Sequence, residues 1–237
     1  MKRVVSLLLA MIMLLGMTAF MEDAEQPAEE KTYFFKYDWD EEDWDGIRPF
    51  EDGEGNNFLL MEGKAHTINN KGKIGPCDSW TFTYTPYDLG IDECTVEAKV
   101  TCLGHKIEGA RGVFSIRHMY ATNYDVQITF AAGDAGSVVN LYNVNNGAVI
   151  ASSADPENGG VGAEGVITTG EEHVVKLVYR YNDDETTTQL LVYVDDVLWL
   201  HAPEIARQSR SAKFGFGASD GTNLEVDYFY CYPTEAE

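Results

Sequence analysis

The sequence predicts an all-β protein whose antiparallel strands pack as a sandwich or barrel. From Tyr33 onward, apolar and polar residues alternate over many short stretches, as in half-buried strands. Polar turn segments separate these stretches, including GDAG at 133–136, NNG at 145–147, NDDE at 182–185 and SDG at 219–221. No stretch shows a helical repeat with caps. Strands joined by tight turns, without helices between them, favour two packed antiparallel layers.

Eight stretches carry the strand pattern. They span residues 81–87, 94–102, 113–118, 124–130, 173–181, 189–200, 213–218 and 224–232. The clearest is CTVEAKVTC at 94–102, which places small and apolar side chains on one face and Glu97 and Lys99 on the other. Because no internal repeat is visible, we expect a single domain over 33–233, followed by a short tail at 234–237.

The N-terminus has a different composition. Lys2 and Arg3 precede an almost unbroken apolar run at 4–20, which predicts a secretory signal peptide over 1–20. An uncleaved membrane anchor is the alternative, because about 17 apolar residues approach the length of a spanning helix. Residues 21–32 are then an acidic linker. We expect a secreted, extracellular protein that meets a membrane only through an uncleaved signal segment.

Net charge narrows the range of partners. The chain carries a formal charge of -22, with 44% hydrophobic and 12% aromatic residues. A strongly acidic surface repels phosphate backbones, so we expect no nucleic-acid partner. The same charge suits the binding of divalent cations.

Four cysteines, an even number in a chain with an export signal, permit disulfides. Cys94 and Cys102 lie on one strand about 26 Å apart and cannot bond to each other. If strands 79–86 and 94–102 form a hairpin, Cys77 lies close to Cys102, which leaves Cys94 for Cys231. The alternative is four buried free thiols.

The order of the strands resembles that of concanavalin A-like lectin/glucanase domains, including laminin-G-like modules and the 3-keto-disaccharide hydrolase-like family. The resemblance lies in RGVFSIRHMYATNYDVQITFAAGDAGSVVNLYN, in EEHVVKLVYRY followed by LLVYVDDVLWL, and in KFGFGASDGTNLEVDYFYCY. The matching features are an Arg ending a strand (Arg117), an Asn-Tyr step and a short hairpin, here Asp195-Asp196 where the family usually has Asp-Gly. It implies two packed antiparallel sheets of jelly-roll type, one of them concave.

The resemblance also implies a structural calcium. In such domains an Asp at the start of the closing strand often ligates the ion, which corresponds to Asp227 here. The carbonyl of Gly63 and the carboxylate of Asp38 are the further candidate ligands, and calcium takes six to eight such oxygens. Alternatively, Asp227 is satisfied by backbone N–H groups or an Arg.

A sugar-binding surface follows from the alternation of side chains. Phe114 and Ile116 face the predicted core, which turns Ser115 and Arg117 to the opposite face. If this is the concave sheet, four side chains line a polar groove: Arg117, Asp125, Gln127 and Tyr193. Four more lie near the loop at its rim: His118, Tyr120, Asn123 and Tyr124. The alternative is an ordinary solvated sheet face in which Arg117 pairs with a carboxylate.

Catalytic residues are not assigned. Glu225 and Asp227 begin like the E-x-D-x-x-E signature of family 16 glycoside hydrolases, but Tyr230 stands where the second Glu is required. His173 falls on the core face and is interpreted as a structural histidine. We therefore expect a non-catalytic, lectin-like protein acting on extracellular glycans. The alternative is a glycoside hydrolase or polysaccharide lyase, which two facing carboxylates with at least one raised pKa would indicate.

Overall fold

The computed structural model describes residues 32–38, 59–60, 65–68, 71–76, 78–85, 93–119, 124–184, 186–206 and 213–234. Thr32–Glu237 forms one compact unit. The predicted signal peptide and most of the acidic linker lie outside the described residues. Over the described ranges, no helix has the length and apolar character needed to cross a bilayer.

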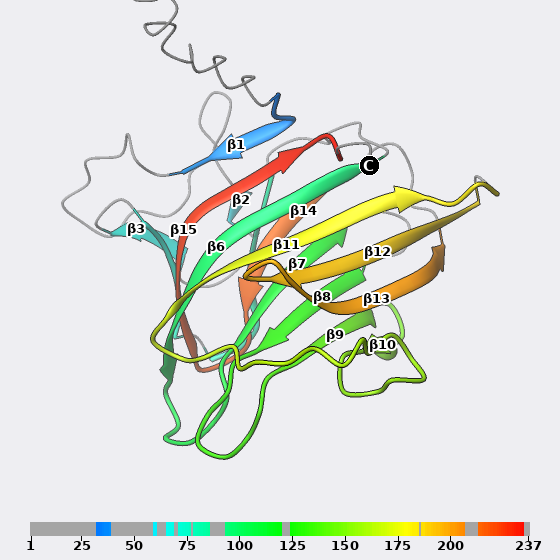
Figure 1. Ribbon diagram of the computed structural model, residues 1–237. Helices are drawn as coiled ribbons and strands as arrows, with labels where there is room; N and C mark the ends of the chain where they lie inside the picture. Colours follow the sequence, from blue (N-terminus) through cyan, green and yellow to red (C-terminus); the bar gives the residue numbers. More distant parts are fainter. Residues whose placement is uncertain are drawn as a thin grey trace, which may run out of the picture. The chain divides into compact units, whose positions relative to one another are not determined.

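Two antiparallel sheets form the two layers of a sandwich, which confirms the predicted fold class (Figure 1). The first sheet has eight strands: β1 (Phe35–Tyr37), β3 (Ala65–Ile68), β4 (Lys71–Ile74), β6 (Cys94–His105), β11 (Glu172–Tyr181), β12 (Thr187–Val194), β13 (Val197–Ala206) and β15 (Thr222–Tyr232). Its order is β13-β12-β11-β6-β15-β4-β3, and β1 also pairs with β15.

The second sheet has seven strands. They are β2 (Leu59–Leu60), β5 (Thr81–Tyr84), β7 (Val113–Met119), β8 (Tyr124–Thr129), β9 (Val138–Asn143), β10 (Ala148–Ser152) and β14 (Lys213–Ala218). Their order is β10-β9-β8-β7-β14-β5-β2. The sequence did not indicate β9 and β10 as strands, although it marked the turn between them.

The core lies between the two sheets and is built from alternate residues of each strand. On β6, every second residue from Cys94 to Cys102 is buried, whereas Glu97 and Lys99 face outward, as the pattern predicts. The seven-stranded sheet contributes large side chains that are fully buried, among them Phe114, Ile116 and Phe214. Burial of each such side chain stabilises the fold by about 1.5–3 kcal/mol.

One predicted strand, at 189–200, is in fact a hairpin. The chain reverses at Asp195 and Asp196, whose φ angles are 52° and 60°, and the two halves become β12 and β13. Two consecutive positive φ angles are typical of the two-residue turn that matches the twist of antiparallel strands. The resemblance to concanavalin A-like domains predicted this short hairpin correctly. The apolar pattern alone had indicated one continuous strand.

The predicted hairpin of strands 79–86 and 94–102 is wrong. β5 pairs with β14 and β2 in one sheet, while β6 pairs with β11 and β15 in the other. The two strands therefore belong to different layers of the sandwich. This removes the argument for bonding Cys77, which lies outside the described residues, to Cys102.

The described cysteines are free in the structure. Cys94, Cys102 and Cys231 are all buried and free, and the predicted bond between Cys94 and Cys231 stays a prediction. The two side chains are nevertheless neighbours and hydrogen-bond to each other. Burial raises the pKa of Cys231 above its usual range, with a further contribution from Cys94. Since the thiolate is the species that exchanges, the Cys231 thiol is poorly reactive.

Candidate functional site

A cavity of about 480 Å³ opens on the face of the seven-stranded sheet that points away from the core. It is lined by residues before and on β5, on β7, β8 and β9, and at the turn after β9. The lining residues are Trp80, Phe82, Tyr84, Arg117, Asp125, Gln127, Tyr142, Asn143, Val144 and Gly147. Three of the four residues predicted for the groove, Arg117, Asp125 and Gln127, therefore lie together.

An aromatic wall forms one side of this cavity. Trp80, Phe82 and Tyr84 alternate along the chain and so share one face. Their ring centroids lie 5.7 and 6.0 Å apart, with interplanar angles of 9° and 19°. Trp80 is 36% exposed, so its ring is accessible from solvent.

Two glycines on the neighbouring strand β14 make room for this wall. A Cβ on Gly215 would lie 2.4 Å from a ring carbon of Tyr84, and one on Gly217 would lie 2.6 Å from a ring carbon of Phe82. A Cβ at either position would also come within 2.3 Å of a β5 carbonyl oxygen. The alternation of Gly with Phe on β14 thus lets the rings of β5 lie over the neighbouring strand.

An ion pair forms the floor of the polar part. Arg117 and Asp125 are directly opposite each other on β7 and β8. The Arg117 Nε and Nη2 groups donate to the two carboxylate oxygens, with 2.7 Å between Nη2 and Oδ2. The guanidinium carbon lies 3.7 Å from the ring centroid of Phe82, and Nη1 donates to the Tyr84 hydroxyl at 3.2 Å. Asp125 is only 3% exposed, so this pairing compensates a buried charge.

Electrostatics keep Tyr84 and Arg117 in their ordinary charge states. Burial raises the pKa of Tyr84, although Arg117 opposes part of that rise, so the phenol stays protonated. Burial alone would lower the pKa of Arg117, but the hydrogen bonds and charge of Asp125 raise it overall. The site therefore presents a neutral phenol and a compensated guanidinium.

Amides and a second phenol complete the lining. Gln127 on β8 is half-buried. The Tyr142 hydroxyl contacts Asn140 Nδ2 at 3.4 Å, and Asn143 Oδ1 accepts from the Asn145 backbone N–H at 3.0 Å. These side chains are donors and acceptors without formal charge.

Other predicted groove residues lie elsewhere. Tyr193 is on β12, in the eight-stranded sheet, so it does not belong to the groove. His118 and Tyr124 are opposite each other in register and are buried in the core, not at a rim. The prediction overlooked that neighbours of the outward-facing Arg117 and Asp125 must point inward. Tyr120 and Asn123 lie outside the described residues.

The predicted calcium ligands do not fit a calcium site. Asp227 lies where the β15 register shifts, and its carboxylate is ion-paired with Lys99 at 3.1 Å and Lys71 at 3.5 Å. The ammonium groups of two lysines therefore balance the Asp227 carboxylate, where a calcium site would need a metal ion. Asp38 pairs with Lys36 at 3.6 Å, and Gly63 lies outside the described residues. Among the described residues, no group of three or more His, Cys, Asp or Glu is arranged to hold a metal ion.

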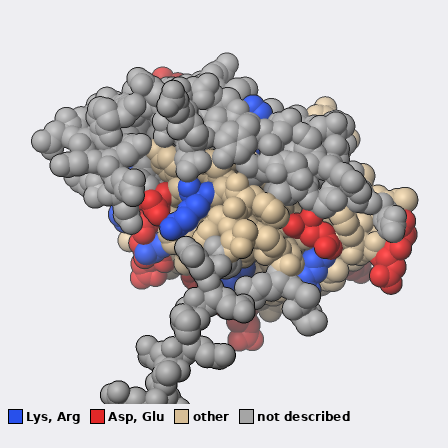
Figure 2. All heavy atoms as spheres, turned by 90° about the horizontal axis from the view of Figure 1, so that it is seen from above, with Lys and Arg blue, Asp and Glu red and all other residues tan. Residues whose placement is uncertain are grey.

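Paired charges are also seen on the molecular surface. In Figure 2, several acidic side chains lie beside basic ones, with uncharged surface between these groups. Glu225, part of the signature rejected above, pairs with Lys73 at 3.7 Å. It lies on β15, in the sheet opposite to the cavity.

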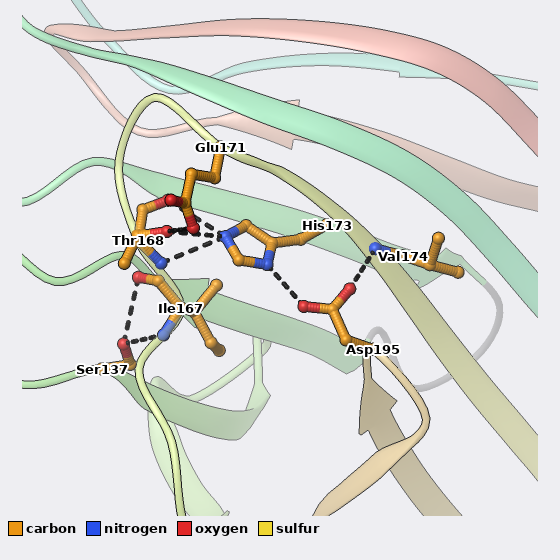
Figure 3. Close-up of polar contacts among 7 residues, drawn as sticks. All are labelled: Ser137, Ile167, Thr168, Glu171, His173, Val174 and Asp195. Carbon is orange, nitrogen blue, oxygen red and sulfur yellow. Dashed lines mark hydrogen bonds and ion pairs between the residues drawn. The ribbon is translucent and has the colours of Figure 1, made fainter.

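A second polar cluster surrounds His173, which is 5% exposed (Figure 3). Its Nδ1 lies 2.6 Å from Asp195 Oδ2, and its Nε2 accepts from the Thr168 backbone N–H at 3.1 Å. Thr168, His173 and Asp195 follow one another in the order of the nucleophile, base and acid of a catalytic triad. However, the Thr168 hydroxyl, which lies 3.3 Å from Nε2, donates to Glu171 at 2.6 Å, so the imidazole does not take its proton. The cluster anchors a loop to the β12–β13 turn, which supports the interpretation of His173 as structural.

No protein-family profile matches the sequence, and no curated protein matches it either. Solved structures do match the fold. The carbohydrate recognition domain of Emp47p is 12% identical with a TM-score of 0.57, over 88% of this chain and 99% of that one. A structure from work on endo-acting O-glycanases of the human gut microbiota is 11% identical with a TM-score of 0.59, over 86% and 100%. A mutant of the alginate lyase Aly36B, in complex with an alginate trisaccharide, is 9% identical with a TM-score of 0.57, over 85% and 98%.

These likenesses establish the fold. The chain has the concanavalin A-like lectin/glucanase fold, as the resemblance of its strand order implies. That fold is shared by carbohydrate recognition domains and by glycan-degrading enzymes.

Proposed function

We propose that this protein is a secreted, non-catalytic carbohydrate-binding protein that takes a glycan into the cavity on the seven-stranded sheet. The observation that carries the proposal is the aromatic wall of Trp80, Phe82 and Tyr84 beside the compensated pair of Arg117 and Asp125. An aromatic ring packs against the apolar face of a sugar, while planar amide and guanidinium groups bond its hydroxyls.

The chemistry of the described lining residues favours binding over hydrolysis. Asp125 is the one carboxylate among them, and Arg117 engages both of its oxygens. Glycoside hydrolysis ordinarily needs two carboxyl groups, one on each side of the scissile bond. Lyase chemistry needs a base that takes a proton from the sugar. Tyr84 is a poor base in its protonated state, because burial raises its pKa.

A polysaccharide-degrading enzyme is the second candidate function. It is supported by the similarity to the glycanase and lyase structures. The two proposals differ in one measurable outcome, because an enzyme shortens the glycan that it binds. Release of new reducing ends or of unsaturated sugars from any bound glycan would favour the enzyme.

A glycan array followed by calorimetry on the glycans that bind tests the proposal. Trp80→Ala should weaken binding by at least about tenfold, since it removes the exposed platform. Phe34→Ala is the matched control, because Phe34 is 37% exposed against 36% for Trp80 and lies beside β1 of the other sheet. Binding to no glycan, or equal losses in both variants, would overturn the proposal.

A calcium chelator added to the same array addresses the metal. We expect unchanged binding, because Asp227 is already paired with two lysines. A loss of binding that added calcium restores would contradict this expectation.

A further inference from the structure

We infer that the cavity selects uncharged sugar units over acidic ones, such as uronates and sulfated sugars, and over cationic amino sugars. This inference rests on the proposed function and adds the substrate class. The expected selectivity follows from the interactions that Arg117 makes with Asp125, Phe82 and Tyr84.

Charge within the cavity is balanced. Arg117 and Asp125 are the charged side chains among the described lining residues, and they neutralise each other through two parallel hydrogen bonds. A sugar carboxylate therefore finds no uncompensated cation there. A sugar ammonium finds no uncompensated carboxylate either.

Geometry prevents Arg117 from leaving its partner for an acidic ligand. Phe82 covers one face of the guanidinium at 3.7 Å, and Nη1 is tied to the Tyr84 hydroxyl. Breaking the pair would leave Asp125, 3% exposed, as an uncompensated buried charge. Loss of one partner of a buried pair is strongly unfavourable.

Donors that suit hydroxyl groups remain in place. Arginine has five N–H groups, of which three are used by Asp125 and Tyr84. The remaining Nη hydrogens, the Gln127 amide and the Tyr142 phenol offer hydrogen bonds without net charge. The formal charge of -22 on the chain adds a field that repels anionic glycans and attracts cationic ones, and salt screens both effects.

The test compares three sets of oligosaccharides of equal length: neutral hexose, uronate and glucosamine. Affinities are measured by calorimetry at low and at high salt. We expect the neutral set to bind at least about tenfold more tightly than the uronate set at both salt concentrations, and than the glucosamine set at high salt. Because the selection depends on the local pair as well as on the overall field, the preference should persist at high salt.

Two variants place an uncompensated cation in the cavity. Asp125→Asn retains the shape of the side chain but frees the charge of Arg117. Gln127→Lys adds a cation and leaves the ion pair intact, so it serves where Asp125→Asn fails to fold. Each should raise the affinity for uronates by about tenfold. Asp196→Asn makes the same charge change at an 88% exposed side chain in the β12–β13 turn, and it should not raise this affinity.

The outcomes separate this inference from the proposed function. If Trp80→Ala abolishes binding but the wild type prefers uronates, or prefers glucosamine at high salt, the inference is wrong and the proposed function stands. Equal gains in uronate affinity for Asp196→Asn and the cavity variants would also overturn it. Binding to no member of these sets and to no glycan of the array overturns both.

Discussion

Arg117 and Asp125 occupy directly opposed positions on β7 and β8, and their two-point ion pair lies against the ring of Phe82. The pair is a structural element as well as a part of the candidate site. Arg117→Ala leaves a buried carboxylate without its partner and should lower the free energy of unfolding by about 3–5 kcal/mol. Urea denaturation followed by fluorescence measures the change.

The exposed pair of Lys176 and Asp196 provides the control for this prediction. Their separation is 3.0 Å, but the Asp196 side chain is 88% exposed. Lys176→Ala should therefore change the unfolding free energy by no more than about 1 kcal/mol. Equal losses in the two variants would show that burial does not determine the strength of the Arg117 pair.

The glycines of β14 provide a second prediction. Gly215→Ala places a Cβ 2.4 Å from a Tyr84 ring carbon and 2.3 Å from the Thr83 carbonyl oxygen. We expect a loss of about 1–3 kcal/mol in the free energy of unfolding, because overpacking forces neighbours to shift. Glycan affinity should fall as well, since the ring that moves belongs to the wall. Gly136→Ala is the control, because an added Cβ there meets no atom within 4 Å.

Much of the polar site was predictable from period-two alternation. Once Phe114 and Ile116 were assigned to the core, Arg117 had to face outward, and the same reasoning applied to Asp125 and Gln127. The aromatic wall was missed because β5 turns threonines inward: Thr81 and Thr83 are fully buried while the rings face the cavity. Its one signal in the sequence is the alternation of Thr with aromatic residues.

Sheet membership could not be derived from local sequence. The alternation along β12 shows that Tyr193 faces away from the core, but not which sheet β12 joins. That choice depends on pairing with β11 and β13, so it is a property of the whole chain. The proposed hairpin of strands 79–86 and 94–102 failed for the same reason.

His118 should make stability depend on pH. Its ring stacks on Phe214 with 4.5 Å between centroids, and neither nitrogen has a hydrogen-bond partner among the described residues. Burial lowers the pKa of His118 from 6.5 to about 3. Between these values the unfolded chain binds a proton that the folded protein does not, so this contribution is fully present above pH 6.5 and is lost as the pH falls toward 3.

His118→Phe tests this contribution, because it retains an aromatic ring and removes the titration. Unfolding free energies are compared for the wild type and the variant at steps of about one pH unit between the two pKa values. The difference between the two proteins should change by up to about 1.4 kcal/mol per pH unit. Parallel curves would show that His118 does not titrate in this way.

The two aspartates of the β12–β13 turn should respond in opposite directions to the same substitution. Both have positive φ, at 52° and 60°, where glycine relieves a strain of roughly 1 kcal/mol. Asp196 makes one exposed ion pair, so Asp196→Gly should stabilise the protein by up to about 1 kcal/mol. Asp195 instead accepts from Val174 N–H at 2.8 Å and lies 2.6 Å from the buried His173 ring.

Asp195→Gly should therefore destabilise the protein despite the same backbone relief, because hydrogen bonds to a charged group contribute about 1.5–3 kcal/mol. Thermal unfolding of the two variants in parallel separates the effect of the turn from that of the anchor. A rise in the unfolding temperature for both variants would show that the link between His173 and Asp195 contributes little. Opposite shifts would explain why this chain carries Asp at the first turn position and would identify Asp196 as the position that glycine suits.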